Sequence, residues 1–212
     1  MSEPILLNTP LDARQTRNLV VGQEVLLSGV LVTARDLAHK YLVEREDSDG
    51  LPYDLAGAVI YHCGPIMQRA GNRCAGNRCA GDRWQAVSAG PTTSARMELY
   101  QAKVIERYRV GAVLGKGGMG PLTAAALAKS GAVYLAAAAG AGALLAKRIA
   151  GVASVWKLDE FGEPEAMWKL EVAGLPAIVA MDSRGGDLYA QVEKDSASRL
   201  KALLGGVSGA PK

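Results

Sequence analysis

Short runs of apolar residues alternate along the chain with longer segments in which apolar residues recur at helical spacing. Buried strands are predicted for the runs at residues 25–32, 58–62, 112–114 and 133–138. Helices are predicted at residues 33–44, 93–108, 121–129 and 142–150. Further strands are predicted at residues 154–158, 167–172 and 177–182. This order predicts an α/β fold with some parallel strand pairing.

One segment interrupts this order. Residues 71–75 and 76–80 are a tandem copy of the sequence GNRCA. Glycine and asparagine at fixed positions are typical of turns, so we expect an inserted surface loop or hairpin tip at residues 68–83. The chain is divided into an N-terminal extension (1–19), a main domain (20–192) and a C-terminal helix and tail (193–212). Residues 205–212 are expected to fray.

Composition narrows the classes of protein. The chain has 212 residues, of which 49% are hydrophobic, so it can bury a sizeable core. Its 24 basic and 21 acidic residues are well mixed, so we expect neither nucleic-acid nor membrane binding. Residues 1–10 lack the pattern of a signal peptide. The uncharged stretch 130–146 is shorter than the roughly 20 apolar residues of a membrane span, so a cytoplasmic protein is expected.

Two turns marked by glycine or proline each precede a predicted helix and carry a fixed cation. They are residues 90–97 (GPTTSARM) and 115–120 (GKGGMG). Backbone N–H groups at a helix start favour an anion, and so does a nearby cation. The second turn formally matches a dinucleotide fingerprint, but no acidic residue follows about 20 positions later. A general anion site is therefore favoured, with a purely structural turn as the alternative.

Arg96 is the sharper indication of an anion. If Thr92 or Thr93 caps the predicted helix, Arg96 lies in its first turn, where the helix dipole disfavours a cation. A bound carboxylate would explain an arginine there, although a solvated side chain is the alternative. Thr92 stands four residues before Arg96, so the two are expected to share a helix face. Arg35 lies in another strand-to-helix corner, where Thr33 or Asp36 could cap the helix.

Other groups offer less chemistry. His39 follows Arg35 by four residues and could reach the same site, whereas His62 ends a strand; a lone histidine is more often structural. The cysteines match neither iron–sulfur nor zinc spacings, so no metal site is expected in this chain. They are Cys63, Cys74 and Cys79. Carboxylates near Pro164 are predicted to form a solvated turn. They are Asp159, Glu160, Glu163 and Glu165.

Taken in order, these motifs resemble the β subunit of two-subunit class I fumarases and L(+)-tartrate dehydratases. The same unit forms the C-terminal domain of single-chain class I fumarases. The matching segments are residues 27–29 (LSG), 33–39 (TARDLAH), 51–55 (LPYDL), 64–66 (GPI), 90–97 (GPTTSARM), 115–119 (GKGGM) and 177–182 (AIVAMD). They cover most of the chain, so residues 20–192 are taken as the catalytic domain.

The resemblance implies a swivelling β/β/α three-layer domain without cluster ligands of its own. A partner α subunit is expected to bind a [4Fe–4S] cluster, one iron of which would act as a Lewis acid on the substrate. The chain would then be part of a hydro-lyase that is active only with the α subunit. An α2β2 heterotetramer and a small dicarboxylate substrate are expected.

By motif position, the resemblance implies that Arg35, Arg96 and Lys116 bind substrate carboxylates. Thr92 corresponds to a threonine proposed to help remove the proton next to a carboxylate, together with an acidic group of the other subunit. A free hydroxyl is a very weak base, so this role needs strong activation. The accessory candidates are Asp36, His39 and Thr93.

Reversible hydration of fumarate to L-malate is the favoured reaction. Conversion of L(+)-tartrate to oxaloacetate is the alternative, because residues 115–123 are very similar to tartrate dehydratases and the two substrates differ by hydroxyl groups. A nucleotide-binding oxidoreductase domain and a non-catalytic scaffold subunit are more distant alternatives.

Overall fold

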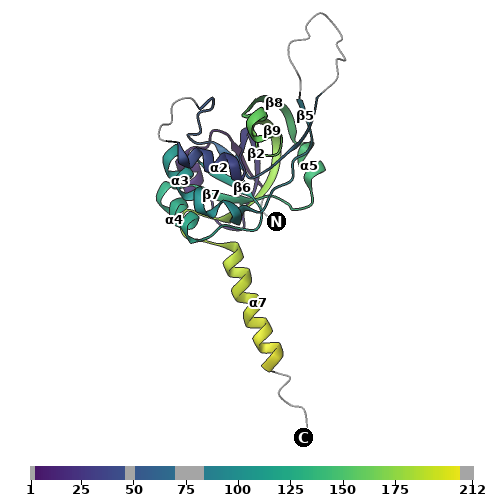
Figure 1. Cartoon of the computed structure of the whole chain (residues 1–212). Helices are drawn as coiled ribbons and strands as arrows, with labels where there is room; N and C mark the ends of the chain where they lie inside the picture. The colour runs from purple at the N-terminus through teal and green to yellow at the C-terminus, as the bar shows by residue number, and fades with distance from the viewer. Residues whose placement is uncertain (1–2, 46–50, 70–83, 206–212) are drawn as a thin grey trace, which may run out of the picture.

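The structure is a computed structural model that describes residues 3–45, 51–69 and 84–205 (Figure 1). The strands are β1 (Ile5–Asn8), β2 (Glu24–Thr33), β3 (Val59–Tyr61), β4 (Ile66–Arg69), β5 (Trp84–Ser88), β6 (Ala112–Gly115), β7 (Val133–Ala136), β8 (Ile149–Trp156) and β9 (Met167–Met181). The helices are α1 (Ala13–Asn18), α2 (Asp36–Glu44), the 3₁₀ helix η1 (Ser94–Met97), α3 (Glu98–Tyr108), α4 (Pro121–Ser130), α5 (Gly142–Ala146), α6 (Leu158–Phe161) and α7 (Leu188–Gly205).

Seven strands form one sheet in the order β1-β2-β3-β6-β7-β9-β8. An additional pairing between β2 and β9 closes five of these strands into a barrel. Neighbours from β1 to β7 run parallel, whereas β9 runs antiparallel to β2, β7 and β8. The predicted α/β class and the parallel pairing are therefore confirmed.

Strand β9 replaces two predicted strands. It is continuous over 15 residues, although the sequence predicts a break between residues 172 and 177. Pro176 lies opposite Leu26 of β2, while β8 pairs with residues 167–172 and β7 with residues 178–181 on the other edge. Pro176 therefore sits where no described strand covers that second edge, and a strand tolerates proline in such a place.

Two further predictions change in extent. The helix predicted at residues 142–150 ends at Ala146, and β8 begins at Ile149, which pairs with Val172 of β9. The predicted hairpin around the copied pentapeptide has antiparallel arms, β4 and β5. The pentapeptides themselves, with Cys74 and Cys79, lie outside the described residues, as do residues 206–212 of the predicted tail.

Alternate residues of the central strands face two different hydrophobic cores. Ala112 and Leu114 of β6 belong to a core to which every barrel strand contributes. Val113, between them, packs in a second core with residues of α2, α3 and α4. The central strands are thus buried on both faces, which explains their nearly continuous apolar sequence.

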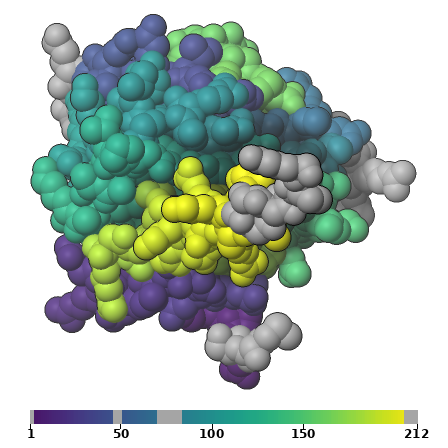
Figure 2. Space-filling view, turned by 90° about the horizontal axis from the view of Figure 1, so that it is seen from below, coloured from purple at the N-terminus to yellow at the C-terminus, as the bar shows by residue number. Residues whose placement is uncertain are grey.

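Helix α7 projects away from the body of the protein (Figure 1). In the view from below, it stands in front of the boundary between the purple N-terminal residues and the teal helices (Figure 2). Side chains from Tyr189 to Leu204 are all exposed. None of the helices in the described part of the chain is long and apolar enough to span a membrane.

Candidate active site

The predicted site residues lie near the carboxyl ends of three neighbouring parallel strands. We call this end of the sheet the edge of the site. Thr33, Tyr61 and Leu114 lie side by side in β2, β3 and β6. Arg35 follows β2 by two residues, and Lys116 directly follows β6. Parallel strands bring the segments that follow them to one edge, which is where α/β sheets commonly bind ligands.

One carboxylate joins two of the predicted cations. Arg96 holds Asp36 with two nitrogens: its Nε donates to Oδ1 at 3.2 Å, and its Nη2 pairs with Oδ2. Nη2 of Arg35 lies 3.9 Å from the same Oδ2 and 3.3 Å from Oε1 of Glu165. The structure therefore brings Arg35 and Arg96, which come from separate corners, within reach of a single carboxylate.

The start of α2 is capped differently from the prediction. Its N-cap residue is Arg35, which makes no side-chain cap hydrogen bond. The Thr33 hydroxyl instead donates to the Ala166 carbonyl and accepts from the Trp168 N–H, so it ties β2 to β9. A carboxylate from far along the chain serves the helix: Oε2 of Glu165 accepts from the Leu37 N–H at 3.0 Å.

The predicted solvated turn near Pro164 is therefore wrong for two of its four carboxylates. Glu165 pairs with Arg35 and the start of α2. Glu163 accepts a hydrogen bond from the Met67 N–H of β4 at 2.6 Å. Both carboxylates hold separate segments together, because backbone N–H groups need acceptors when they are taken from water.

Lys116 is held by its backbone to the segment that carries Arg96. The Ser94 N–H donates to the Lys116 carbonyl at 3.0 Å, and the Lys116 N–H donates to Ser94 Oγ at 3.2 Å. Thr93 forms a parallel bridge with Lys116, and the Thr92 N–H donates to the His62 carbonyl at 2.7 Å. Residues 92–94 thus lie across the ends of β3 and β6, with Thr92 half-buried and Thr93 exposed.

The threonines do not take the predicted capping role. Thr93 is the N-cap of η1 without a side-chain cap hydrogen bond, and Thr92 precedes the helix. The predicted shared helix face of Thr92 and Arg96 is therefore wrong, because Thr92 lies outside the helix. Arg96 lies in a 3₁₀ turn that leads into α3, where Asp36 supplies its carboxylate.

The start of α4 already holds an anion. The Glu98 carboxylate accepts from the N–H groups of Gly120, Leu122 and Thr123 at 2.8–3.1 Å and from the Thr123 hydroxyl at 2.6 Å. The prediction that this helix start binds a ligand is therefore wrong, because a side chain of α3 fills the position. The same contacts remove the physical basis for a nucleotide phosphate at residues 115–120.

We expect Glu98→Ala to lower the free energy of unfolding by about 2–3 kcal/mol, because a charged acceptor is lost and the N–H groups are left without a partner. Chemical denaturation of the full chain measures this. Glu106→Ala is the matched control, since its exposed pair with Lys129 should contribute less than about 1 kcal/mol. Equal effects of the two substitutions would contradict the capping role.

Both histidines lie beneath the site. The His39 ring is fully buried, with Nδ1 2.8 Å from the Arg35 carbonyl and Nε2 2.8 Å from Gln101 Oε1. His62 is also buried, and its Nδ1 lies 2.9 Å from Ser94 Oγ. Burial lowers the pKa of His39 and lowers that of His62 well below its ordinary value. His39 thus contacts the backbone of the Arg35 corner.

The charges of the site are unevenly paired. Asp36 and Glu165 lie beside the two arginines, whereas no carboxylate among the described residues forms an ion pair with Lys116. Arg96 is 48% exposed and has five N–H donors, so it keeps donors for a ligand. Nε of Arg35 is buried and has no hydrogen-bond partner in the described structure. Arg96 can therefore still donate to an anion, and no described carboxylate neutralises the Lys116 ammonium group.

The described residues do not fit an iron–sulfur cluster. Across residues 3–45, 51–69 and 84–205, no group of three or more His, Cys, Asp or Glu side chains could hold a metal ion. Cys63 is buried, and burial raises the pKa of its thiol to about 12, whereas a cluster ligand must be a thiolate. Any cluster would need ligands from outside these residues.

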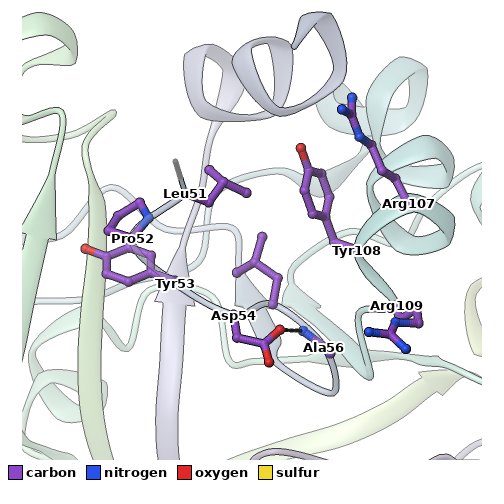
Figure 3. A pocket seen from close by; sticks show the side chains of 9 residues that line it. Leu51, Pro52, Tyr53, Asp54, Ala56, Arg107, Tyr108 and Arg109 are labelled. Carbon is purple, nitrogen blue, oxygen red and sulfur yellow. Dashed lines mark hydrogen bonds between the residues drawn. The ribbon is translucent and has the colours of Figure 1, made fainter. Parts of the chain in front are cut away.

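A separate hollow of about 380 Å³ lies at the other end of the parallel strands, near the amino ends of β3 and β6 (Figure 3). Residues 51–56, which precede β3, form one side, and the end of α3 with Arg109 forms the other. Asp54 is tied locally, because its Oδ1 accepts from the Ala56 N–H at 2.9 Å. None of the predicted site residues lines this hollow.

The fold and the edge residues define an α/β barrel protein that presents cations beside the carboxyl ends of its parallel strands. The family model for the fumarase C-terminus matches residues 2–192. The chain therefore belongs to the fumarase C-terminus family, in agreement with the resemblance noted from its motifs.

Named relatives are similar over nearly the whole chain. The "Putative fumarate hydratase class I" of Geobacillus stearothermophilus is 44% identical over 92% of this chain, which spans only 35% of that relative. The "Putative L(+)-tartrate dehydratase subunit beta" of Methanocaldococcus jannaschii is 42% identical over 92% of this chain and 96% of its own length. The L(+)-tartrate dehydratase subunit beta of Escherichia coli (strain K12) is 39% identical over 94% of this chain and 93% of its own length.

The groups that hold the corners of the site in place were not predicted from the sequence. Glu98 and Glu165 act on helices that begin far from them in sequence. Glu98 lies in the first turn of α3, where an acidic residue is expected to stabilise the start of its own helix. The sequence therefore did not indicate that Glu98 binds the start of α4. Ser94 and Gln101 carried no signal, because a polar residue inside a predicted helix is ordinarily assigned to the solvated face.

Proposed function

We propose that this chain is the β subunit of a hydro-lyase that interconverts fumarate and L-malate and supplies the residues that bind the substrate carboxylates. The observation that carries the proposal is the convergence of Arg35 and Arg96 on one carboxylate, at the edge where Lys116 emerges. Family membership and the names of the relatives support the reaction class.

The three cations match a substrate with two carboxylates. Guanidinium groups bind carboxylates through paired N–H donors, and the lysine ammonium adds a point charge. Removing a proton from the carbon next to a carboxylate places extra negative charge on that carboxylate. Fixed cations beside it stabilise this charge and lower the barrier. We assign Arg35, Arg96 and Lys116 to this role, with Asp36 as the group that sets the spacing of the arginines.

Thr92 is our candidate for assisting proton removal. It is half-buried, and its N–H is fixed to the His62 carbonyl, so its position at the edge is set by the backbone. No basic group in the described residues is hydrogen-bonded to its hydroxyl, which fits a requirement for an acidic group from another subunit. Thr93 and His39 are proposed as accessory residues that shape this corner.

We further propose that the site is completed by an α subunit in an α2β2 heterotetramer. Two of the relatives are named as beta subunits, which supports a partner. The [4Fe–4S] cluster is assigned to that subunit because the family resemblance implies it. The swivelling β/β/α arrangement is likewise proposed, supported by the two cores on either side of the sheet.

L(+)-tartrate dehydratase activity is the second candidate. It is favoured by relatives of that name which match this chain over 93–96% of their own length. Tartrate also has two carboxylates and differs from malate by a hydroxyl group, which the three cations would not distinguish. Residues of the α subunit are therefore proposed to select the substrate.

Kinetics separate these candidates. The chain, purified anaerobically with its α subunit, is expected to hydrate fumarate and dehydrate L-malate, with lower kcat/KM for L(+)-tartrate. Absorbance of fumarate follows the first two reactions, and oxaloacetate formation follows the third. Activity with tartrate alone would overturn the choice of fumarate, and full activity of this chain without partner or iron would overturn the shared site.

A further inference from the structure

A chain of buried polar side chains runs beneath the candidate site. His39, His62, Ser94 and Gln101 are all 0% exposed. Nε2 of His39 and Nε2 of His62 lie 2.8 and 2.7 Å from the same oxygen, Oε1 of Gln101. The second amide atom of Gln101, Nε2, is buried without a hydrogen-bond partner in the described structure. In this arrangement the Gln101 NH2 group has no acceptor, whereas the Gln101 carbonyl oxygen lies next to both histidine rings.

The Arg35 carbonyl decides which ring nitrogen of His39 carries hydrogen. A carbonyl can only accept, so Nδ1 of His39, at 2.8 Å, must be its N–H donor. A neutral ring has one N–H group, and full burial disfavours a second proton. Nε2 of His39 is therefore an acceptor, and the Gln101 atom that faces it must be a donor.

Exchanging the oxygen and nitrogen of the Gln101 amide at their present positions satisfies both rings. The NH2 group then lies between the two Nε2 atoms and gives one hydrogen to each. His62 is left with hydrogen on Nδ1, which donates to Ser94 Oγ at 2.9 Å. Since Ser94 Oγ then accepts from both His62 and the Lys116 N–H, its own hydrogen goes to the Tyr134 hydroxyl oxygen, 2.9 Å away. The unpaired buried atom becomes a carbonyl oxygen, and buried carbonyl groups lack a partner more often than buried N–H groups do.

We propose that Gln101 is a positioning residue that donates to two neutral histidines and thereby ties the Arg35 corner to the Lys116 corner. The link runs from the Arg35 carbonyl through His39, Gln101 and His62 to Ser94, whose Oγ accepts from the Lys116 N–H at 3.2 Å. The hydrogen-bond assignment depends only on contacts within this chain. Its effect on activity rests on the proposed hydro-lyase function.

The assignment is tested by NMR on the full chain. The sequence contains two histidines, so histidine labelled with ¹⁵N and a purification tag without histidine give signals from His39 and His62 only. We expect both rings to be neutral, with hydrogen on Nδ1, at pH 7. Hydrogen on Nε2 of either ring, or a doubly protonated ring, would overturn the proposal, whatever reaction the protein catalyses.

A matched pair of substitutions tests the positioning role. In Gln101→Glu the ionised carboxylate only accepts, so both rings should place hydrogen on Nε2. The contact with the Arg35 carbonyl then fails, and kcat/KM of the assembled enzyme should fall about 10–100-fold. Gln85→Glu, the same change at an exposed position of β5, should leave the spectrum and the activity unchanged.

Two outcomes separate the proposal from the function. An assembled enzyme in which Gln101→Glu switches the ring hydrogens but is as active as Gln85→Glu would overturn the positioning role. An unmodified protein that shows the expected rings but hydrates neither fumarate nor tartrate would overturn the proposed function and leave the hydrogen-bond assignment intact. The spectrum of the unmodified chain decides the assignment even where the variant does not fold.

Discussion

Lys116→Ala is expected to lower the turnover of the assembled enzyme at least ~10²-fold, because the substitution removes a cation that we propose to stabilise the developing charge. The corner itself should remain in place. Both backbone groups of Lys116 are held by Ser94, and neither contact uses the lysine side chain. The initial rate of fumarate hydration by the enzyme reassembled with the proposed α subunit measures the effect.

Lys103→Ala is the control for this substitution. Lys103 is an exposed residue of α3, so its removal should change neither turnover nor assembly. Size-exclusion chromatography establishes that both variants bind the α subunit. Unchanged turnover of assembled Lys116→Ala would contradict the proposed role and favour a scaffold subunit that contributes no charge to the reaction.

The free energy of unfolding should fall as the pH is lowered from about 6.5 to 5. Burial lowers the pKa of both histidines in the native protein, so below pH 6.5 the unfolded chain binds protons that the native chain does not. Each proton excluded from the native state contributes a slope of about 1.4 kcal/mol per pH unit, and two histidines contribute at most about 2.7. Above this window the histidines add no pH dependence.

Denaturant titrations at several pH values measure this slope. Other side-chain types at their ordinary pKa values do not titrate in the window, and the sequence has two histidines. His62→Asn should therefore reduce the slope by about half, whatever its effect on absolute stability. A free energy of unfolding that stays constant or rises as the pH falls to 5 would show that the histidines are protonated in the native state.

The sequence was sufficient to predict the strands of the barrel wherever an apolar run is bounded by glycine or a polar turn. Residues 112–114 and 133–138 are of this kind, and both form strands. The continuity of β9 was not predictable, because Gly174 and Pro176 ordinarily end a strand. Their places depend on which neighbours pair with β9, and those neighbours lie far away in sequence.

Of the residues in the candidate site, only the cations could be predicted from the sequence. Arg35, Arg96 and Lys116 are marked by their strand-to-helix corners, a local feature of the chain. The carboxylates that organise these corners are not local: Glu165 reaches α2 across 128 residues, and Asp36 reaches Arg96 across 60. The sequence around an acidic residue in a polar turn predicts that it is solvated, because a partner that lies far away in sequence is known only once the fold is known.

The closure of the barrel limits how another polypeptide can join this one. Strand β2 pairs with β1 and β3 along one edge and with β9 along the other, and β3 and β6 each lie between two neighbours. The strands that lead to the cations thus offer no free backbone edge in the described chain for a visiting strand to extend. The proposed α subunit must therefore contact the segments that connect strands and helices. Side-chain contacts, rather than hydrogen bonds between strands, would determine the specificity of this interface.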